Sequence, residues 1–119
     1  MGETHVMVTV RNPLDRQRYW EGEFLVDTGA VDSLVPRRAL EAIGVQSRGP
    51  RTYRLADGSA VEFEIAFAEL EFMEDVAPAR VIVGDDEAEP LLGVIALEQA
   101  GVLVDPEGEK LRRREFFRL

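Results

Sequence analysis

The residues best suited to chemistry in this chain come directly after the apolar run Phe24–Val26, in the order Asp27-Thr28-Gly29-Ala30. The run is typical of a buried strand, and Gly29 allows the chain to turn sharply where that strand ends. A carboxylate in such a place is costly to bury unless it is paired, hydrogen-bonded or used in a reaction. The sequence therefore makes Asp27 a candidate for acid–base chemistry. On the tripeptide alone, an aspartate that caps backbone amides of a turn is the better explanation.

Strands and a short helix are predicted around this motif. Valines alternate with other residues over Thr4–Arg11, which is typical of a half-buried strand. After a turn at Asn12–Asp15, a second strand is predicted over Arg18–Val26 and leads into the motif. Downstream, Pro36 suits the first turn of a short helix and Gly44 suits its end.

The second half of the chain predicts β-hairpins. Arg51–Leu55 and Ala60–Phe67 are predicted strands, and the Asp57-Gly58 pair between them strongly favours a tight turn. Other strands are predicted over Ala68–Phe72, Ala79–Val83, Val102–Asp105 and Lys110–Arg113, the last two joined across residues 106–108.

One short sequence recurs in the chain. Residues 39–45 (ALEAIGV) and residues 96–102 (ALEQAGV) are identical at five of seven positions. Each copy follows a glycine that ends an apolar run, Gly29 in the first and Gly93 in the second. The repeat is explained by a chance match between helices rich in alanine and leucine, or by two equivalent strand–turn–helix units in one folded-over domain. Two copies are too few for a solenoid.

Length and composition predict a single soluble domain over residues 1–119. The net charge is −9, and all of the acidic excess lies in residues 61–119, so a nucleic-acid partner is not expected. No apolar stretch approaches the roughly 18 residues of a membrane span, and the chain does not start with a secretion signal, so no membrane partner is expected. Because cysteine is absent as well, we expect a cytoplasmic protein without disulfides or thiolate metal sites.

Three features occur in a fixed order: Asp27-Thr28-Gly29-Ala30, the Asp57-Gly58 hairpin, and Leu91-Leu92-Gly93 followed by a short helix. In this order they resemble a retropepsin-like aspartic protease of the single-motif, bacterial type, over roughly Tyr19–Asp105. The resemblance implies a mainly β fold, a closed barrel with two short helices, that is active as a symmetric homodimer. It also implies an aspartic endopeptidase that cuts extended segments of a peptide or protein substrate, with no cofactor and no metal.

The resemblance makes Asp27 the catalytic carboxylate. Because the chain holds one Asp-Thr-Gly, the second aspartate of the pair comes from Asp27 of another copy. The two carboxyl groups share one proton, so that one activates a water molecule as general base and the other polarises the scissile carbonyl. Thr28 then ties the two loops together across the interface, and Gly29 lets the backbone approach the dyad and the substrate.

The same resemblance places the substrate between the loop after Asp27 and a hairpin flap. The residues expected to bind substrate are Ala30, Val31, Asp32, Leu55, Ala56, Asp57, Gly58 and Ser59. Leu91, Leu92 and Gly93 are expected to pack beneath the loop and keep it rigid. Two simpler explanations stay open: Asp32 fits an Asx-type turn equally well, and Asp57 is better explained as a hairpin-turn residue.

Two positions depart from the viral members of the family. In those proteins an acidic residue follows the Asp-Thr-Gly-Ala, and it pairs near the dimer interface with an arginine that follows the second-half glycine. Here these positions hold Val31 and Val94. Because both partners are replaced together, apolar packing is expected in place of a stranded charge. Ala30 has no hydroxyl to donate to Asp27, so we expect activity to extend toward neutral pH.

Two other functions stay open. The same fold serves as a non-proteolytic peptide-binding or dimerisation module, although gripping a strand does not require a buried pair of carboxylates. An unrelated enzyme that uses Asp27 alone lacks a partner base or a metal cluster in the sequence. His5 is the only histidine and has no nucleophile pattern around it, and the acidic residues of 85–89 do not have the spacing of an EF-hand loop.

Overall fold

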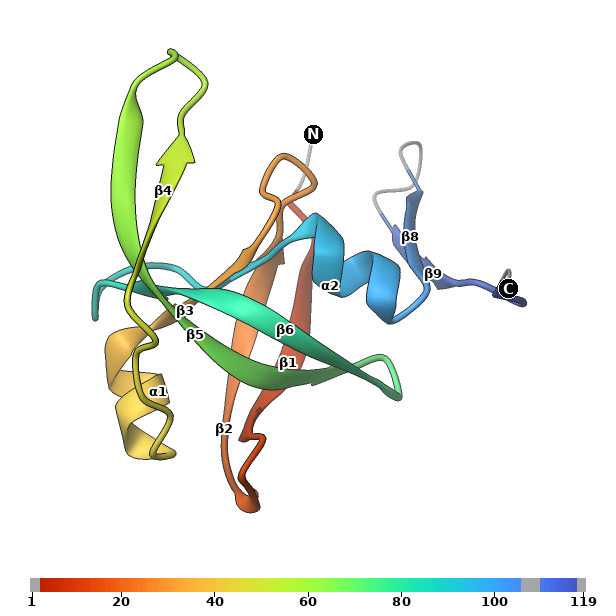
Figure 1. Cartoon of the computed structure of the whole chain (residues 1–119). Helices are drawn as coiled ribbons and strands as arrows, with labels where there is room; N and C mark the ends of the chain where they lie inside the picture. Colours follow the sequence, from red (N-terminus) through yellow and green to blue (C-terminus); the bar gives the residue numbers. More distant parts are fainter. Residues whose placement is uncertain (1–2, 106–109, 118–119) are drawn as a thin grey trace.

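The computed structural model describes residues 3–105 and 110–117, and this part of the chain forms nine strands and two short helices (Figure 1). The strands are β1 (His5–Asn12), β2 (Asp15–Val26), β3 (Ser33–Pro36), β4 (Pro50–Arg54), β5 (Ala60–Phe72), β6 (Asp75–Gly84), β7 (Leu91–Leu92), β8 (Val102–Asp105) and β9 (Lys110–Arg113). The helices are α1 (Arg37–Ala42) and α2 (Val94–Gln99). The prediction of a mainly β chain with two short helices is confirmed. Neither helix of the described residues is long and apolar enough to cross a membrane.

Seven strands form one sheet in the order β1-β2-β7-β3-β6-β5-β4, and β8 pairs with β9 in a separate two-stranded sheet. The first strand also pairs with β5, where Thr9–Arg11 lies opposite Glu69–Glu71, so that six strands close into a ring. These strands and both helices contribute to one cluster of buried apolar side chains, which includes Val8, Val10, Phe24, Val35, Leu40, Leu70, Val81, Leu92 and Leu97. The ring and its core therefore fix the strands that lead to Asp27.

The shortest strand, β7, lies between β2 and β3. It runs parallel to β2, with Val26 opposite Leu92, and antiparallel to β3, with Leu34 opposite Leu91. The chain that leaves β2 at Asp27 must therefore pass the end of β7 before it enters β3. Residues 27–32, here called the Asp27 loop, make this crossing next to the residues that follow β7.

A long hairpin extends beyond the ring. β4 pairs with the first part of β5, from Pro50 opposite Glu64 to Arg54 opposite Ala60, while the rest of β5 pairs with β6. This hairpin, residues 50–64, projects at the upper left of Figure 1 and is here called the β4–β5 hairpin. The turn predicted at Asp57-Gly58 is confirmed, and Gly58 has a φ of 88°, a conformation that favours glycine.

The region around Pro36 differs from the prediction. Pro36 is the last residue of β3 and also the N-cap of α1, so the helix itself begins at Arg37. The sequence analysis missed β3, whose residues Ser33–Pro36 pair in parallel with β6 and meet β7 on the other side. A short segment buried between two strands is extended because of its neighbours, and a proline at the end of a strand does not prevent this.

Other boundaries shift in the second half of the chain. The strands predicted over residues 60–67 and 68–72 form the single strand β5. The last hairpin is confirmed as β8 and β9, but its turn at residues 106–108 lies outside the described residues.

The two copies of the repeated sequence have the same local structure. Each forms a six-residue helix that ends before a glycine with positive φ, 77° at Gly44 and 68° at Gly101. Such glycines commonly terminate helices because they adopt the left-handed conformation at no steric cost. The same two positions of each helix are buried, namely Ala39, Leu40, Ala96 and Leu97.

Candidate active site

Main-chain hydrogen bonds hold the Asp27 loop against the segment that follows β7. The Asp27 N–H donates to the Leu92 carbonyl oxygen at 3.0 Å, which extends the pairing of β2 with β7 by one residue. Further along, the Val94 N–H donates to the Ala30 carbonyl oxygen at 2.8 Å. The next amide, of Ile95, donates to the carbonyl oxygen of Val31 at 3.2 Å. The loop is therefore attached to the end of β7 at its start and to the first residues of α2 further along.

The Asp27 side chain lies at the turn and is partly buried. Its Oδ1 accepts a hydrogen bond from the Gly29 N–H at 3.0 Å, so the aspartate does cap a backbone amide. A Cβ at Gly29 would lie only 3.3 Å from this oxygen. Oδ2 makes no hydrogen bond within the described part of the chain, and no acidic side chain there bonds to Asp27. One carboxylate oxygen is therefore available to a ligand or to a second carboxyl group.

Gly93 supports the loop from below and has no room for a side chain. A Cβ at this position would lie 2.7 Å from the carbonyl carbon of Asp32 and 2.9 Å from the carbonyl oxygen of Val31. The Gly93 N–H donates to the buried Ser33 Oγ at 2.9 Å. Next to it, Leu92 is fully buried in the core. The structure thus brings Leu92 and Gly93 into contact with the Asp27 loop, and the backbone at Gly93 leaves space for glycine alone. The third predicted supporting residue, Leu91, instead pairs with Leu25 of β2 and Leu34 of β3.

The tip of the β4–β5 hairpin, residues 55–59, is exposed and is held by its own hydrogen bonds. The Gly58 N–H donates to the Leu55 carbonyl oxygen at 2.9 Å, and the Leu55 N–H donates to the Ser59 carbonyl oxygen at 2.8 Å. Asp57 Oδ1 accepts bonds from the Ser59 hydroxyl and N–H, and these bonds lower the pKa of Asp57. Within the described residues no hydrogen bond or ion pair joins residues 55–59 to the Asp27 loop, so their role in substrate binding stays a prediction.

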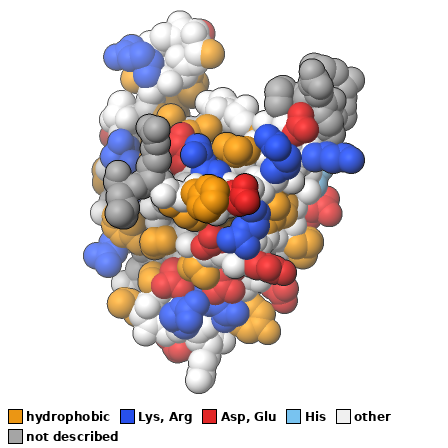
Figure 2. Space-filling view, turned by 90° about the vertical axis from the view of Figure 1, so that its right-hand side faces the viewer, with side chains coloured by type: hydrophobic (Ala, Val, Ile, Leu, Met, Phe, Trp, Pro, Cys, Tyr) orange, Lys and Arg blue, Asp and Glu red, His pale blue; other side chains and the backbone are white. Residues whose placement is uncertain are grey.

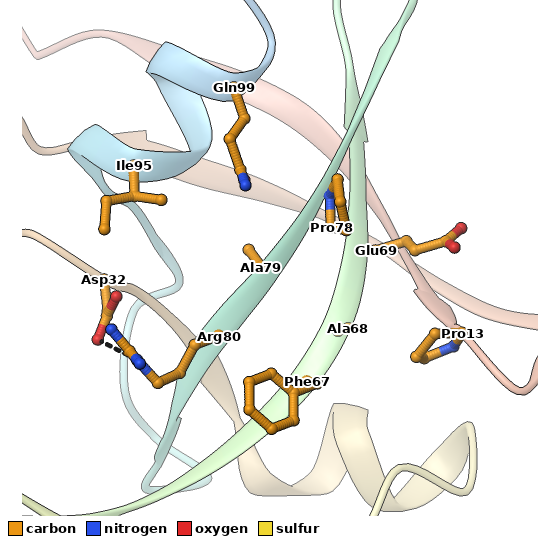
Figure 3. A pocket seen from close by; sticks show the side chains of 10 residues that line it. All are labelled: Pro13, Asp32, Phe67, Ala68, Glu69, Pro78, Ala79, Arg80, Ile95 and Gln99. Carbon is orange, nitrogen blue, oxygen red and sulfur yellow. Dashed lines mark hydrogen bonds and ion pairs between the residues drawn. The ribbon is translucent and has the colours of Figure 1, made fainter.

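Asp32 ends the Asp27 loop, and its side chain is only 2 % exposed. Its Oδ2 accepts a hydrogen bond from the Tyr53 hydroxyl of β4 at 2.6 Å and another from Nε of Arg80 in β6 at 3.1 Å. Figure 3 shows the carboxylate and the guanidinium facing one another. The Asx-type turn that the sequence allowed for Asp32 is therefore not formed, because both contacts of this carboxylate in the described structure go to side chains of distant strands.

Neither Tyr53 nor Arg80 was predicted from the sequence as a site residue. Arg80 is the one charged residue in the strand predicted over Ala79–Val83. A charged side chain in an apolar strand is usually paired with an opposite charge. Nothing in the local pattern identified that partner as Asp32, which is 48 positions away. Burial of the hydroxyl, followed by its bond to Asp32, raises the pKa of Tyr53 to about 12. The bond to Asp32 also raises the pKa of Arg80.

A cavity of about 350 Å³ opens beside this cluster. Asp32 and Arg80 border it, and the other lining residues come from β5, β6, α2 and the turn before β2 (Figure 3). Asp27 is not among the lining residues. The cavity is therefore next to the Asp32 cluster and is not the place of the candidate catalytic carboxylate.

One comparison with known proteins assigns the chain to a family. A family model, that of the gag-polyprotein aspartyl protease, matches residues 20–99, about two thirds of the chain. The chain belongs to this family of retropepsin-like aspartic proteases. The match begins in β2 and ends with α2, so it includes the Asp27 loop, the β4–β5 hairpin and β7. No curated protein sequence matches the chain.

Membership in the family supports an aspartic peptidase, a hydrolase whose chemistry depends on carboxyl groups. In this chain the Asp-Thr-Gly motif lies in the Asp27 loop, with Thr28 exposed beside the carboxylate. Val31, which replaces the acidic residue of the viral members, is 58 % exposed in the single chain. The apolar packing expected at that position is therefore not made within one chain.

Proposed function

We propose that the protein is an aspartic endopeptidase in which Asp27 of two copies forms the catalytic dyad. The observation that carries the proposal is the state of this carboxylate: Oδ1 is held by the Gly29 N–H, and Oδ2 has no partner in the described chain. The loop around it is fixed by the bonds to Leu92 and Val94, which keeps the carboxylate in one position. A single chain thus offers half of a dyad, and a symmetric dimer supplies the other half.

The chemistry follows from two carboxyl groups in contact. Both cannot ionise, so the pair holds one proton between them. The ionised member takes a proton from a bound water molecule while the protonated member donates to the carbonyl oxygen of the scissile peptide bond. The apparent pKa values of such a reaction belong to the pair of Asp27 groups and not to one of them. Thr28 and Gly29 act in the proposal as the interface residue and the point of close backbone approach.

The proposed substrate is an extended peptide segment between the Asp27 loop and the β4–β5 hairpin. The hairpin lies at the end of the sheet order, so the edge of β4 that does not face β5 is open to main-chain hydrogen bonds with such a segment. The predicted substrate contacts remain those of the loop and the hairpin tip: Ala30, Val31, Asp32, Leu55, Ala56, Asp57, Gly58 and Ser59.

A second copy is the proposed partner, and exposed apolar side chains support it. Val31 in the Asp27 loop, Leu55 at the hairpin tip and Phe116 near the end of the described chain are 58 %, 48 % and 77 % exposed. Each of these side chains would gain apolar contact if a second copy covered it. Figure 2 views the molecule from the side of α2 and the β8–β9 sheet, where hydrophobic, acidic and basic side chains are interspersed. In the proposed dimer the two Asp27 loops, with Val31, face one another.

We further propose a cytoplasmic location and no nucleic-acid or membrane partner. The absence of cysteine fits a reducing compartment, and the net charge of −9 opposes binding to phosphate backbones.

The test compares the wild type with Asp27→Asn on a diverse peptide mixture, from about pH 4 to about pH 7.5. The substitution keeps the shape of the side chain and removes the shared proton. We expect the wild type to cleave and the variant to be inactive, with cleavage sites identified by mass spectrometry. Sedimentation at the assay concentration establishes that both proteins are dimeric. A dimeric wild type that cleaves nothing would instead support the peptide-binding or dimerisation module.

A further inference from the structure

Three separate parts of the chain meet at the buried carboxylate of Asp32. The carboxylate belongs to the Asp27 loop, the Tyr53 hydroxyl comes from the β4–β5 hairpin, and the Arg80 guanidinium comes from β6. Both donors bond to the same oxygen, Oδ2, at 2.6 and 3.1 Å. We call this group the Asp32 cluster.

The cluster is held together by electrostatics. A carboxylate that is 2 % exposed has lost its hydration, and it is stable when ionised because a cation and a hydroxyl replace the water. Arg80, whose side chain is 28 % exposed beside the cavity, supplies the charge (Figure 3). Tyr53 then supplies a hydrogen bond, not a charge, to the same oxygen. Loss of Arg80 would therefore strand a buried charge, whereas loss of the Tyr53 hydroxyl would remove a single bond.

The Tyr53 bond joins the hairpin to the Asp27 loop. Other side-chain bonds of the hairpin run within it, as from Arg54 to the Gly58 carbonyl oxygen, or lie at its base, as between Arg37 and Glu64. Tyr53 is two residues from the tip at Leu55, so its bond acts on the part of the hairpin that is nearest to the tip. The Tyr53 ring packs edge-on against Phe63 of the opposite strand, which fixes its direction.

From these contacts we propose that Tyr53 and Arg80 are positioning residues of the protease, which hold the β4–β5 hairpin in place over the Asp27 loop through Asp32. The inference rests on the proposed function, because a hairpin that binds substrate is useful only to an enzyme or a binding module. Arg80 holds the Asp32 carboxylate in one orientation, and the Tyr53 hydroxyl attaches the hairpin to that carboxylate. The hairpin is then ordered before substrate arrives, so binding does not have to order it.

The kinetic test is Tyr53→Phe, with Tyr19→Phe as the matched control. Both variants remove one hydroxyl and keep the ring, and both rings lie under an arginine. Tyr19, however, is 53 % exposed on β2, and in the described structure no hydrogen bond joins its hydroxyl to the Asp27 loop. We expect Tyr53→Phe to raise KM about tenfold, the value of one hydrogen bond to a charged group, and to change kcat less than about twofold. Tyr19→Phe should leave both constants unchanged. An unchanged KM in Tyr53→Phe overturns the proposal.

A second readout needs no catalysis. Hydrogen exchange of the Leu55 and Gly58 amides, which are bonded within the tip, is measured in the Asp27→Asn background, where no cleavage occurs. Adding Tyr53→Phe should speed this exchange about tenfold while exchange in the core strands stays constant; adding Tyr19→Phe should not. Equal exchange in the two variants overturns the positioning role. Suppose instead that Tyr53→Phe speeds the exchange but the wild type cleaves no peptide. That result would retain the positioning role and reject the protease.

A double variant tests whether Tyr53 acts through Asp32. In an Asp32→Asn protein the carboxylate is gone, so the further change Tyr53→Phe should add little to KM or to hairpin exchange. Full additivity of the two changes overturns the connection through Asp32. If Asp32→Asn does not fold, the KM and exchange comparisons of Tyr53→Phe with Tyr19→Phe still decide the positioning role.

Discussion

At the scale of single residues, the side chain that follows the Asp-Thr-Gly is expected to set the environment of the proposed dyad. Ala30 is partly buried, and its N–H and C=O are both bonded, to Asp27 and Val94, so a change of side chain leaves the backbone of the loop in place. A hydroxyl at this position can donate to the ionised carboxylate and stabilise it, whereas alanine cannot. The pH range of the proposed reaction is therefore expected to depend on whether the side chain at position 30 carries a hydroxyl group.

We predict that Ala30→Thr shifts the acidic limb of the pH–rate profile down by about one unit, because a hydrogen bond to the charged form lowers the pKa of the pair. Ala30→Val is the matched control, since it has the shape of threonine without the hydroxyl. The measurement is kcat/KM against pH for both variants and the wild type. Equal shifts in the two variants would show that side-chain volume, and not the hydroxyl, determines the profile.

Tyr53 gives a second prediction at this scale. Burial, and then the bond to Asp32, raises its pKa to about 12 from an ordinary value of 10.0, so the folded protein favours the protonated phenol. Its contribution to stability is therefore complete below about pH 10 and is lost as the pH rises toward about 12. An ultraviolet titration of the two tyrosines should contain one midpoint near 12, and Tyr53→Phe should remove it. A midpoint that persists in this variant would contradict the assignment.

At the scale of the elements, the crossing of the Asp27 loop over the chain after β7 depends on Gly93. Gly93 has a φ of −91°, which any residue can adopt. Glycine is therefore required here only because a larger side chain would not fit. A methyl group there would meet backbone atoms at 2.7 to 2.9 Å, and backbone in a bonded loop cannot move aside easily.

We therefore predict that Gly93→Ala lowers the free energy of unfolding by about 3 kcal/mol, the upper part of the range for overpacking. Gly58→Ala is the comparison. It has nothing within 4 Å but a φ of +88°, and should cost about 1 kcal/mol from the backbone alone. Urea unfolding at one fixed protein concentration measures both, since the apparent stability of a dimer depends on concentration. A smaller loss in Gly93→Ala than in Gly58→Ala would show that the loop can move away from α2.

Many of the strands and helices could be predicted from the sequence, for reasons that differ between elements. The β4–β5 hairpin follows from the Asp57-Gly58 pair, which determines a turn locally. β3 could not be predicted, because Ser33–Pro36 is extended only by virtue of its neighbours β6 and β7. The partners of Asp32 were missed for the same reason. Tyr53 and Arg80 are 21 and 48 positions away, and local periodicity carries no information on which side chains meet across strands.

At the scale of the whole molecule, the separation of the proposed dyad between two copies has a consequence that a monomeric enzyme lacks. A copy with Asp27→Asn still folds and pairs, but each mixed dimer has one aspartate and one asparagine, which cannot share the proton that the reaction uses. An inactive copy therefore inactivates the wild-type copy with which it pairs. The same reasoning separates the dyad from an enzyme that uses Asp27 of a single chain.

We predict that wild type, unfolded and refolded together with an equal amount of Asp27→Asn, retains about half of its activity, because random pairing leaves about a quarter of the dimers with two aspartates. The control is wild type refolded with the same mass of an unrelated inert protein, and it should retain all of its activity. Activity is measured above the dimer dissociation constant, so that dilution plays no part. Full activity beside the variant would place the whole reaction in one chain and exclude the shared dyad.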